Sequence, residues 1–421
     1  MFFSTHFPSS RIRTGSAALT KLFQTFPVLW VFLLQTLAAL SPTNQDLDAA
    51  LQTSDPFVEI DHVVEHHIGL GNLPGAVVLV GHQDAIAFEK AYGNRSVEPE
   101  IEAMTPETVF DLASLTKVVA SAPSVMLLVQ KGRLKLDDPV SKYLPAFGQA
   151  GKKKVTLRQL LVHYSGLPAD LRQTRRRRIT SKNVLSRIYQ TRLVARPGQQ
   201  FIYSDLGFVV LGKVVEKVTG QSLSRFAQEN IFSPLGMAST GFLPRPEVIP
   251  NIAPTERLKE GGMLRGQVHD PLASKLGGVA GDAGLFSTAR DLARFCQMLL
   301  QRGSLNGVEV FRPDTVALMT SPQSPDGKPD IRGFGWDIQS TYSSVKGSFF
   351  SPASYGHTGY TGTSLWIDPE TQTFLIILTN RVHPDGKGNV KELRTELANI
   401  VGRTFQPASL PPADATGTHQ P

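Results

Sequence analysis

The sequence has little cysteine, and the apolar run near its N-terminus is short. Cys296 is the one cysteine of the 421 residues, which excludes an internal disulfide and a cysteine-based metal site. The run at residues 28–40 is shorter than the roughly 20 residues that a membrane-spanning helix needs. Charged residues make up 19% of the chain and apolar residues 41%. This composition predicts a mainly globular protein rather than a disordered one.

No nucleic-acid-binding module is recognisable in the sequence. The formal net charge is +7, and part of this charge lies in the run Arg175–Arg178. Aromatic residues do not alternate with this run, whereas surfaces that bind single strands combine basic and aromatic side chains. We therefore interpret the run as a solvated loop and expect no nucleic-acid partner.

The first 40 residues are typical of a secretory signal peptide or an N-terminal anchor. Arg11, Arg13 and Lys21 precede the apolar run, and small residues lead into Ser41. We expect an exported protein, periplasmic or secreted, that touches the inner membrane only if this segment is retained uncleaved. A mis-assigned start codon is the alternative interpretation.

The order of periodic segments predicts an α+β fold. An amphipathic helix at 55–69 and a β-hairpin at 75–92 come first, and a long, mainly helical stretch follows at about 133–330. The later elements are strands expected at 333–338, 365–368 and 373–379 and a last helix at 390–401. An antiparallel sheet built from both chain ends, flanked by helices and joined to a helical lobe, satisfies this order. A cleft between the sheet and the lobe is the expected place for a site.

Four segments follow from these patterns. They are a signal or anchor at 1–40, a linker at 41–54, one globular domain at 55–403 and a disordered, proline-rich tail at 404–421.

The first helix carries a pattern found in zinc peptidases. Its residues 62–66, HVVEH, match H-x-x-E-H. The pattern is short, and a helix that packs one face on a sheet explains the segment without a metal ion. We expect no metal, and a zinc peptidase remains the outside alternative.

Residues 110–117, FDLASLTK, contain the first candidate catalytic pair. Ser114 and Lys117 are three residues apart and therefore share one face of a helix. At a helix start, free N–H groups and the helix dipole favour an oxyanion beside Ser114. A serine hydroxyl attacks well only when a base takes its proton, and Lys117 assists only if its charge is suppressed or shared. The alternative is a helix-capping serine followed by a solvated lysine.

Two further segments carry candidate site residues. Tyr203 precedes a helix expected at 206–219, which Asp205 is placed to cap. A phenol near a lysine ammonium has a lowered pKa and can act as a general base. The segment 355–363, YGHTGYTGT, is rich in glycine, so its backbone can approach a ligand and supply an N–H to an oxyanion hole. A glycine-rich hairpin is the alternative for this last segment.

Together these segments resemble the serine β-lactamase and penicillin-binding-protein superfamily, in its class C and DD-peptidase branch. The S-x-x-K, Y-x-N-like and H-T-G motifs occur in the family's order, and the stretches 132–140, 160–168 and 281–287 also match. The resemblance covers about residues 55–403 and implies the β-lactamase/transpeptidase-like fold. It implies a serine hydrolase without metal or cofactor.

The resemblance also implies roles for individual residues. Ser114 would form an acyl-enzyme, which water then hydrolyses, while Lys117 and Tyr203 manage its proton. Asp205 would face the acyl amide of the substrate, and His357, Thr358 and Gly359 would lie on the strand that binds it. The N–H groups of Tyr360 and Ser114 would together bind the oxyanion.

Two departures from the family pattern bear on the substrate. Asp205 replaces the usual Asn, and His357 replaces the Lys of most β-lactamases. A histidine is only partly charged near neutrality, so we expect His357 to bind a substrate carboxylate less well as pH rises. The leading hypothesis is a D-alanyl carboxypeptidase or related cell-wall peptidase. The alternatives are an esterase or class C-like β-lactamase with the same site, and a catalytically silent peptidoglycan-binding protein.

Overall fold

The computed structural model describes residues 56–171 and 179–406. The expected signal or anchor, the linker, the run Arg175–Arg178 and the tail beyond residue 406 lie outside these ranges.

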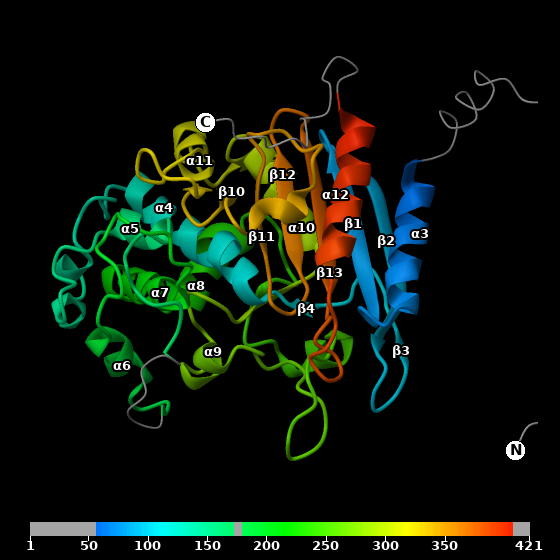
Figure 1. Ribbon diagram of the computed structural model, residues 1–421, viewed down its shortest axis with the longest axis horizontal. Helices are drawn as coiled ribbons and strands as arrows, with labels where there is room; N and C mark the ends of the chain where they lie inside the picture. Colours follow the sequence, from blue (N-terminus) through cyan, green and yellow to red (C-terminus); the bar gives the residue numbers. More distant parts are fainter. Residues whose placement is uncertain (1–55, 172–178, 407–421) are drawn as a thin grey trace, which may run out of the picture. The chain divides into compact units, whose positions relative to one another are not determined.

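An antiparallel sheet of eight strands runs through the described part of the chain (Figure 1). All neighbouring strands in it are antiparallel, and β1 from the N-terminal part pairs with β13 from the C-terminal part. The sheet is therefore built from both chain ends, as predicted. In order across the sheet the strands are β3 (Glu102–Ala103), β2 (Ala85–Ser96), β1 (Gly75–His82), β13 (Thr373–Thr379), β12 (Ser364–Asp368), β11 (Tyr355–Thr358), β10 (Asp337–Gln339) and β9 (Ile331–Arg332).

Both faces of this sheet are covered by helices. On β1, Val77 and Leu79 pack into a large core shared with α4 (Ala122–Gln130), α7 (Asp205–Thr219) and α10 (Ala289–Leu300). Val78 and Val80 point to the other face and pack under α3 (Pro56–Gly69) and α12 (Lys391–Phe405). Successive strand residues face opposite sides, so burial on both sides explains the nearly continuous apolar run of β1.

The predicted helical lobe forms part of the large core, to which its Leu160, Ile188 and Phe226 belong. Its other helices are α5 (Leu157–Leu161), α6 (Val184–Gln190), α8 (Leu223–Ala227), α9 (Pro271–Lys275) and α11 (Pro313–Thr320). Short strands in this region form two small sheets, one of β4 (Phe110–Asp111), β6 (Leu285–Ser287) and β5 (Gly241–Phe242), and one of β7 (Ser304–Leu305) and β8 (Val308–Glu309).

The predicted elements are largely confirmed, with two differences. The strand expected at 333–338 is wrong over its first half, because Gly335 has a φ of 85° and the Gly333 N–H bonds to the Trp336 carbonyl, which makes a turn. The last helix continues to Phe405 and so includes the first two residues of the tail expected at 404–421.

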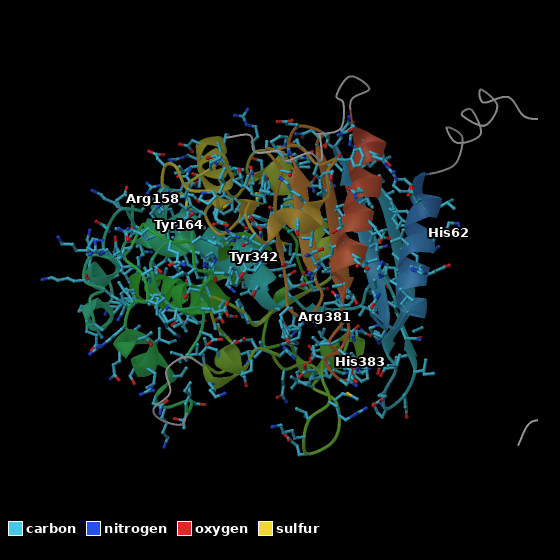
Figure 2. The ribbon with its side chains drawn as sticks, in the orientation of Figure 1. His62, Arg158, Tyr164, Tyr342, Arg381 and His383 are labelled. Atoms are coloured by element: carbon cyan, nitrogen blue, oxygen red, sulfur yellow. The ribbon has the colours of Figure 1, made fainter. Side chains whose placement is uncertain are left out.

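The zinc-peptidase pattern lies on the solvent side of α3. His62, Glu65 and His66 are all exposed, and Figure 2 shows His62 at the edge of the molecule, away from Tyr342 and Arg381. Within residues 56–171 and 179–406, no group of three or more His, Cys, Asp or Glu side chains is placed to hold a metal ion. Packing of α3 on the sheet accounts for the segment.

One described segment, Ala113–Gln130, is long and apolar enough to cross a membrane by length and composition alone. Of this segment, 83% is buried inside the protein. It is the core segment that carries Ser114, and its apolar character follows from that burial.

Candidate active site

Ser114 lies in a distorted start of the helix that crosses the core. A 3-10 turn, Ala113–Leu115, is followed by a π turn, Lys117–Ser121, and only then by the regular helix α4. Pro123 occupies the first turn of α4, where a missing N–H leaves no hydrogen bond unmade. The change from the π turn to the regular helix comes just before this proline, past the turn around Ser114.

The backbone next to Ser114 is held in an unusual conformation. Ala113 has a φ of 47°, a region that costs a non-glycine residue about 1–3 kcal/mol unless its surroundings hold it. The Ala113 N–H donates to Asp111 Oδ1 at 2.9 Å, and the Thr116 hydroxyl donates to the Ala113 carbonyl at 2.6 Å. These bonds fix the turn that presents Ser114.

Lys117 is fully buried directly beneath Ser114. Its Nζ donates to Ser114 Oγ at 3.0 Å and to the Asp282 carbonyl at 3.0 Å, and it lies 2.8 Å from Asp205 Oδ1. The contact expected from the three-residue spacing is present. The alternative of a solvated lysine is wrong.

The charge state of this group differs from the sequence-based expectation. Burial alone would lower the pKa of Lys117, but the Asp205 carboxylate, through its charge and its hydrogen bond, is the leading cause that outweighs burial and raises it. Burial raises the pKa of Tyr203, and the opposing effects of Lys117 and Ser114 do not offset this. The expected lowering of the Tyr203 pKa is therefore wrong in its net sign. In the resting site Lys117 is an ammonium and Tyr203 a neutral phenol.

Tyr203, in the loop before α7, and Asp205, the first residue of α7, both lie against Lys117. The Tyr203 ring centre lies 5.1 Å from Lys117 Nζ. Ser204, not Asp205, caps α7, because the Ser204 hydroxyl accepts from the Gly207 N–H at 3.4 Å. The expected capping role of Asp205 is thus wrong, and its carboxylate binds Lys117 instead.

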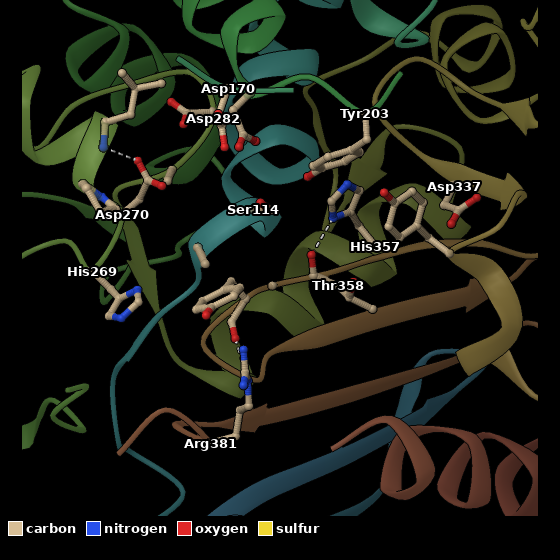
Figure 3. A pocket seen from close by; sticks show the side chains of 18 of the residues that line it. Ser114, Asp170, Tyr203, His269, Asp270, Asp282, Asp337, His357, Thr358 and Arg381 are labelled. Atoms are coloured by element: carbon tan, nitrogen blue, oxygen red, sulfur yellow. Dashed lines mark hydrogen bonds between the residues drawn. The ribbon is translucent and has the colours of Figure 1, made fainter. Parts of the chain in front are cut away.

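His357 lies on β11 next to Tyr203, and the centres of the two rings are 5.9 Å apart (Figure 3). Its Nδ1 is 2.8 Å from the Thr358 carbonyl, to which it donates, so Nε2 is the unprotonated nitrogen. Burial, with the charges of Arg332 and Lys117, lowers the pKa of His357 far below its usual value. This direction runs against the expected titration of His357 near neutrality and favours the neutral ring.

The turn after β11 is fastened to the backbone just before Ser114. The Thr361 hydroxyl donates to the Asp111 carbonyl at 2.8 Å, and the Thr363 hydroxyl donates to the Leu112 carbonyl at 3.0 Å. A Cβ at Gly359 would meet the Leu112 oxygen at 2.5 Å, so only glycine allows this approach. The close approach to Leu112 therefore explains why the H-T-G motif has glycine at its last position.

A pocket of about 830 Å³ opens beside Ser114. Lys117 is not among the lining residues, because it is covered by the residues around it. The predicted site residues that line the pocket are Ser114, Tyr203, Asp205, His357, Thr358, Gly359 and Tyr360.

Several charged side chains of the pocket wall were not predicted. Asp282 lies in the matching stretch 281–287, which was the available signal for it, whereas nothing in the sequence marked Arg332, Arg381 or Arg394. Both carboxyl oxygens of Asp282 are buried without a hydrogen-bond partner in the described part of the chain. Burial and the nearby carboxylates of Asp270 and Asp205 raise the pKa of Asp282 far above its usual value.

This arrangement suits nucleophilic attack on a carbonyl group. A buried ammonium beside a hydroxyl and a phenol can stabilise the negative charge that forms when a proton leaves the hydroxyl. The adjoining glycine-rich strand and the pocket offer a place for the acyl group.

Comparison with known proteins agrees with this geometry. The family model described as Beta-lactamase matches residues 60–399. A protein of Escherichia coli K12 named "Putative D-alanyl-D-alanine carboxypeptidase" is 32% identical over 361 residues, which cover 77% of this chain and 82% of that protein. A protein of the same name from Salmonella typhimurium is 33% identical over 395 residues, covering 85% of this chain and 90% of that protein.

Solved structures show the same fold. The octameric penicillin-binding protein homologue from Pyrococcus abyssi has a TM-score of 0.66 and 24% identity, covering 83% of this chain and 78% of that one. EstCE1, a hydrolase with promiscuous acyltransferase activity, has a TM-score of 0.67 and 24% identity, covering 82% of this chain and 98% of that one. The predicted α+β fold is confirmed. The chain belongs to the Beta-lactamase family and is a serine hydrolase of the β-lactamase and penicillin-binding-protein type.

Proposed function

We propose that the protein is a D-alanyl carboxypeptidase or related cell-wall peptidase that works through an acyl-enzyme on Ser114. The observation that carries this proposal is the contact of Lys117 Nζ with Ser114 Oγ at 3.0 Å, with Tyr203 beside both. The phenolate form of Tyr203, which the Lys117 ammonium stabilises, accepts the proton of Ser114 Oγ as this oxygen attacks the carbonyl carbon. The N–H groups of Ser114 and Tyr360 bind the oxyanion.

Two steps follow: release of the leaving amine, which completes acylation, and hydrolysis of the acyl-enzyme. The phenol of Tyr203 returns the proton to the leaving amine as the peptide bond breaks, which leaves Ser114 esterified. Water then attacks the ester carbonyl and loses a proton to Tyr203, and Ser114 Oγ regains a proton as it departs. No metal or cofactor is needed for any of these steps.

A substrate with a terminal carboxylate fits the cations of the pocket. Arg381 and Arg394 line it, and neither is paired with a carboxylate within residues 56–171 and 179–406. Since His357 is neutral, a substrate carboxylate would be attracted by other cations of the pocket, among them these two arginines. The names of the enterobacterial relatives point to the same substrate class.

Esterase activity on small acyl esters is the second candidate. The neutral His357 stands where many β-lactamases carry a lysine, so the substrate strand itself supplies no positive charge. A neutral ester needs none, and the fold is shared with EstCE1. For the same reason we expect β-lactam turnover to be lower than that of peptides or esters.

A substrate panel separates these activities. Purified protein is assayed on an acyl-D-Ala-D-Ala peptide, p-nitrophenyl esters and nitrocefin, and released D-Ala, nitrophenol and opened lactam are measured. Ser114→Ala should abolish every activity. Ser124→Ala, a buried serine in α4 without a hydrogen-bond partner in the described part, is the matched control and should retain them. No turnover of any substrate by the wild type would favour a silent binding protein, and nitrocefin turnover above all others would indicate a β-lactamase.

Export of the protein is a separate proposal, supported by the basic and apolar pattern of residues 1–40. Fractionation of host cells, with antibody detection, should place the chain in the periplasm, the medium or the inner membrane. Recovery of the full-length chain in the cytoplasmic fraction would contradict it.

A further inference from the structure

His163 contacts the ring of Tyr203 and forms hydrogen bonds to the residues on either side of it in the chain. The two ring centres are 4.5 Å apart, with an angle of 30° between the ring planes. The His163 carbonyl accepts from the Ile202 N–H at 2.9 Å, and His163 Nδ1 accepts from the Ser204 N–H at 3.0 Å. One residue therefore holds the backbone on both sides of Tyr203 and one face of its ring.

His163 is itself firmly held. Its φ is 61°, in the left-handed region that a non-glycine residue keeps only when its surroundings enforce it. Its ring is buried and lies 5.0 Å from the ring of Phe208 on α7. The residue belongs to the stretch 160–168, to which the proposed function assigns no role.

The ring is neutral, which its hydrogen bond requires. Nδ1 can accept from Ser204 only while it carries no proton, so the ring proton sits on Nε2. Nε2 has no hydrogen-bond partner in the described ranges. Burial, together with the charges of Arg332 and Lys117, lowers the pKa of His163 far below its usual value. The hydrogen bond from Ser204 and the lowered pKa both favour the neutral ring, which keeps Nδ1 an acceptor.

We propose that His163 is a positioning residue of the reaction, which fixes Tyr203 where its phenol can exchange a proton with Ser114. His163 is not among the residues that line the pocket, so it acts through Tyr203 and not on the substrate. The inference rests on the proposed function, in which Tyr203 handles the proton of Ser114. A misplacement of about 1 Å at a reacting group can cost roughly 100-fold in rate.

Two substitutions at His163 separate the acceptor from the bulk of the ring. His163→Asn keeps a side-chain acceptor and tolerates the left-handed backbone, whereas His163→Leu keeps volume and loses the acceptor. We expect kcat on a p-nitrophenyl ester to fall about 100-fold in His163→Leu and less than about fivefold in His163→Asn, with KM nearly unchanged in both. Equal losses in the two variants would overturn the inference.

A double-mutant cycle with Tyr203→Phe tests whether the loss passes through Tyr203. In the wild type, Tyr203→Phe should cost about 100-fold or more in kcat. In His163→Leu the same change should cost less than about tenfold, because the phenol is already misplaced. If the losses in kcat of the two single variants multiply fully in the double variant, His163 acts independently of Tyr203 and its role is structural only.

Controls keep this test independent of folding and of the proposed function. His67 on α3 is another buried imidazole, and its Nδ1 contacts Asn72 Nδ2 at 2.9 Å. The control variant His67→Leu should lower Tm without lowering kcat. If His163→Leu does not fold, His163→Gly replaces it in the cycle with the same expectations, since glycine suits the backbone and lacks an acceptor. A Tyr203→Phe variant as active as the wild type would refute the proposed function of Tyr203, not the placement of His163.

Discussion

The Asp205 carboxylate lies 2.8 Å from Lys117 Nζ and holds the lysine of the S-x-x-K motif as a charged ammonium. The Asn that the family resemblance implies at this position would carry no charge, so the ion pair depends on Asp205. Asp205 raises the pKa of both Lys117 and Tyr203. The site therefore works with a more basic phenol than it would have beside an Asn.

Asp205→Asn should move the ascending limb of the profile of kcat/KM against pH toward lower pH. Removing the carboxylate removes a cause that raises the Tyr203 pKa, so the phenol loses its proton more easily. The measurement uses a neutral p-nitrophenyl ester, with the exposed Asp326→Asn as control. A limb that stays in place, or moves upward, would contradict this role of Asp205.

Lys117 and Tyr203 should act as one unit. Lys117→Ala and Tyr203→Phe should each lower kcat by about 100-fold or more, and the double variant should be little worse than the poorer single variant. Both residues serve the same proton of Ser114, so removing the second adds little. Steady-state kinetics on one ester give the comparison, and fully multiplicative losses would count against a shared network.

His357 should not contribute a titration between pH 5 and 8. Because its pKa lies far below the usual value of about 6.5, a carboxylate-bearing peptide and a neutral ester should give parallel profiles of kcat/KM in this range. His357→Gln, which removes any imidazole titration, should leave the shape of both profiles unchanged. If kcat/KM of the wild type fell near pH 6.5 for the peptide alone, and did not fall in His357→Gln, the prediction would be wrong and His357 would be charged at lower pH.

Arg381 should contribute to the binding of peptides that carry a carboxylate and not to the binding of neutral esters. Its guanidinium lines the pocket, where it lies over the Tyr360 ring at 4.5 Å. Arg381→Gln should raise KM for a carboxylate-bearing peptide about tenfold, the loss of one charge-assisted contact worth roughly 1.4 kcal/mol. KM for a neutral ester should change less than about twofold. Equal changes on both substrates would remove Arg381 from carboxylate recognition.

Asp282 should lower the stability of the protein as pH rises. Its folded-state pKa is raised above the unfolded value, so stability is lost on going from pH 4 toward neutral pH as the buried acid is driven to ionise. Asp282→Asn removes this effect. Its Tm should exceed that of the wild type at pH 8 and differ little at pH 4, as measured by thermal melts. A lower Tm at both values would show that the carboxyl group is a favourable part of the fold.

The contact of Ser114 with Lys117 could be predicted from their spacing in the sequence. The charge states of the site residues could not be predicted in this way. Ser114 and Lys117 meet because residues three apart share a helical face, and β1 and β13 pair because both are buried on two sides. The neutral state of His357 depends on Arg332, which only the folded chain brings near. Sequence patterns report neighbours along the chain, and pKa values depend on neighbours in space.

The choice between Ser204 and Asp205 as the cap of α7 illustrates the same limit. Both residue types cap helices well and they are adjacent in the sequence, so propensity does not decide between them. Lys117, which lies far away in the chain, pairs with the carboxylate, and Ser204 caps the helix. His163 went unassigned for a comparable reason, since its contacts with Ile202 and Ser204 join segments about forty residues apart.

The most direct test of this account is the site of covalent labelling. The protein is treated with a fluorophosphonate probe, and the adduct is located by intact mass and peptide mapping, with Ser124→Ala as a matched control. We predict one adduct, on Ser114, in the wild type and in Ser124→Ala, and none in Ser114→Ala. An adduct on another serine, or full hydrolase activity in Ser114→Ala, would contradict the mechanism.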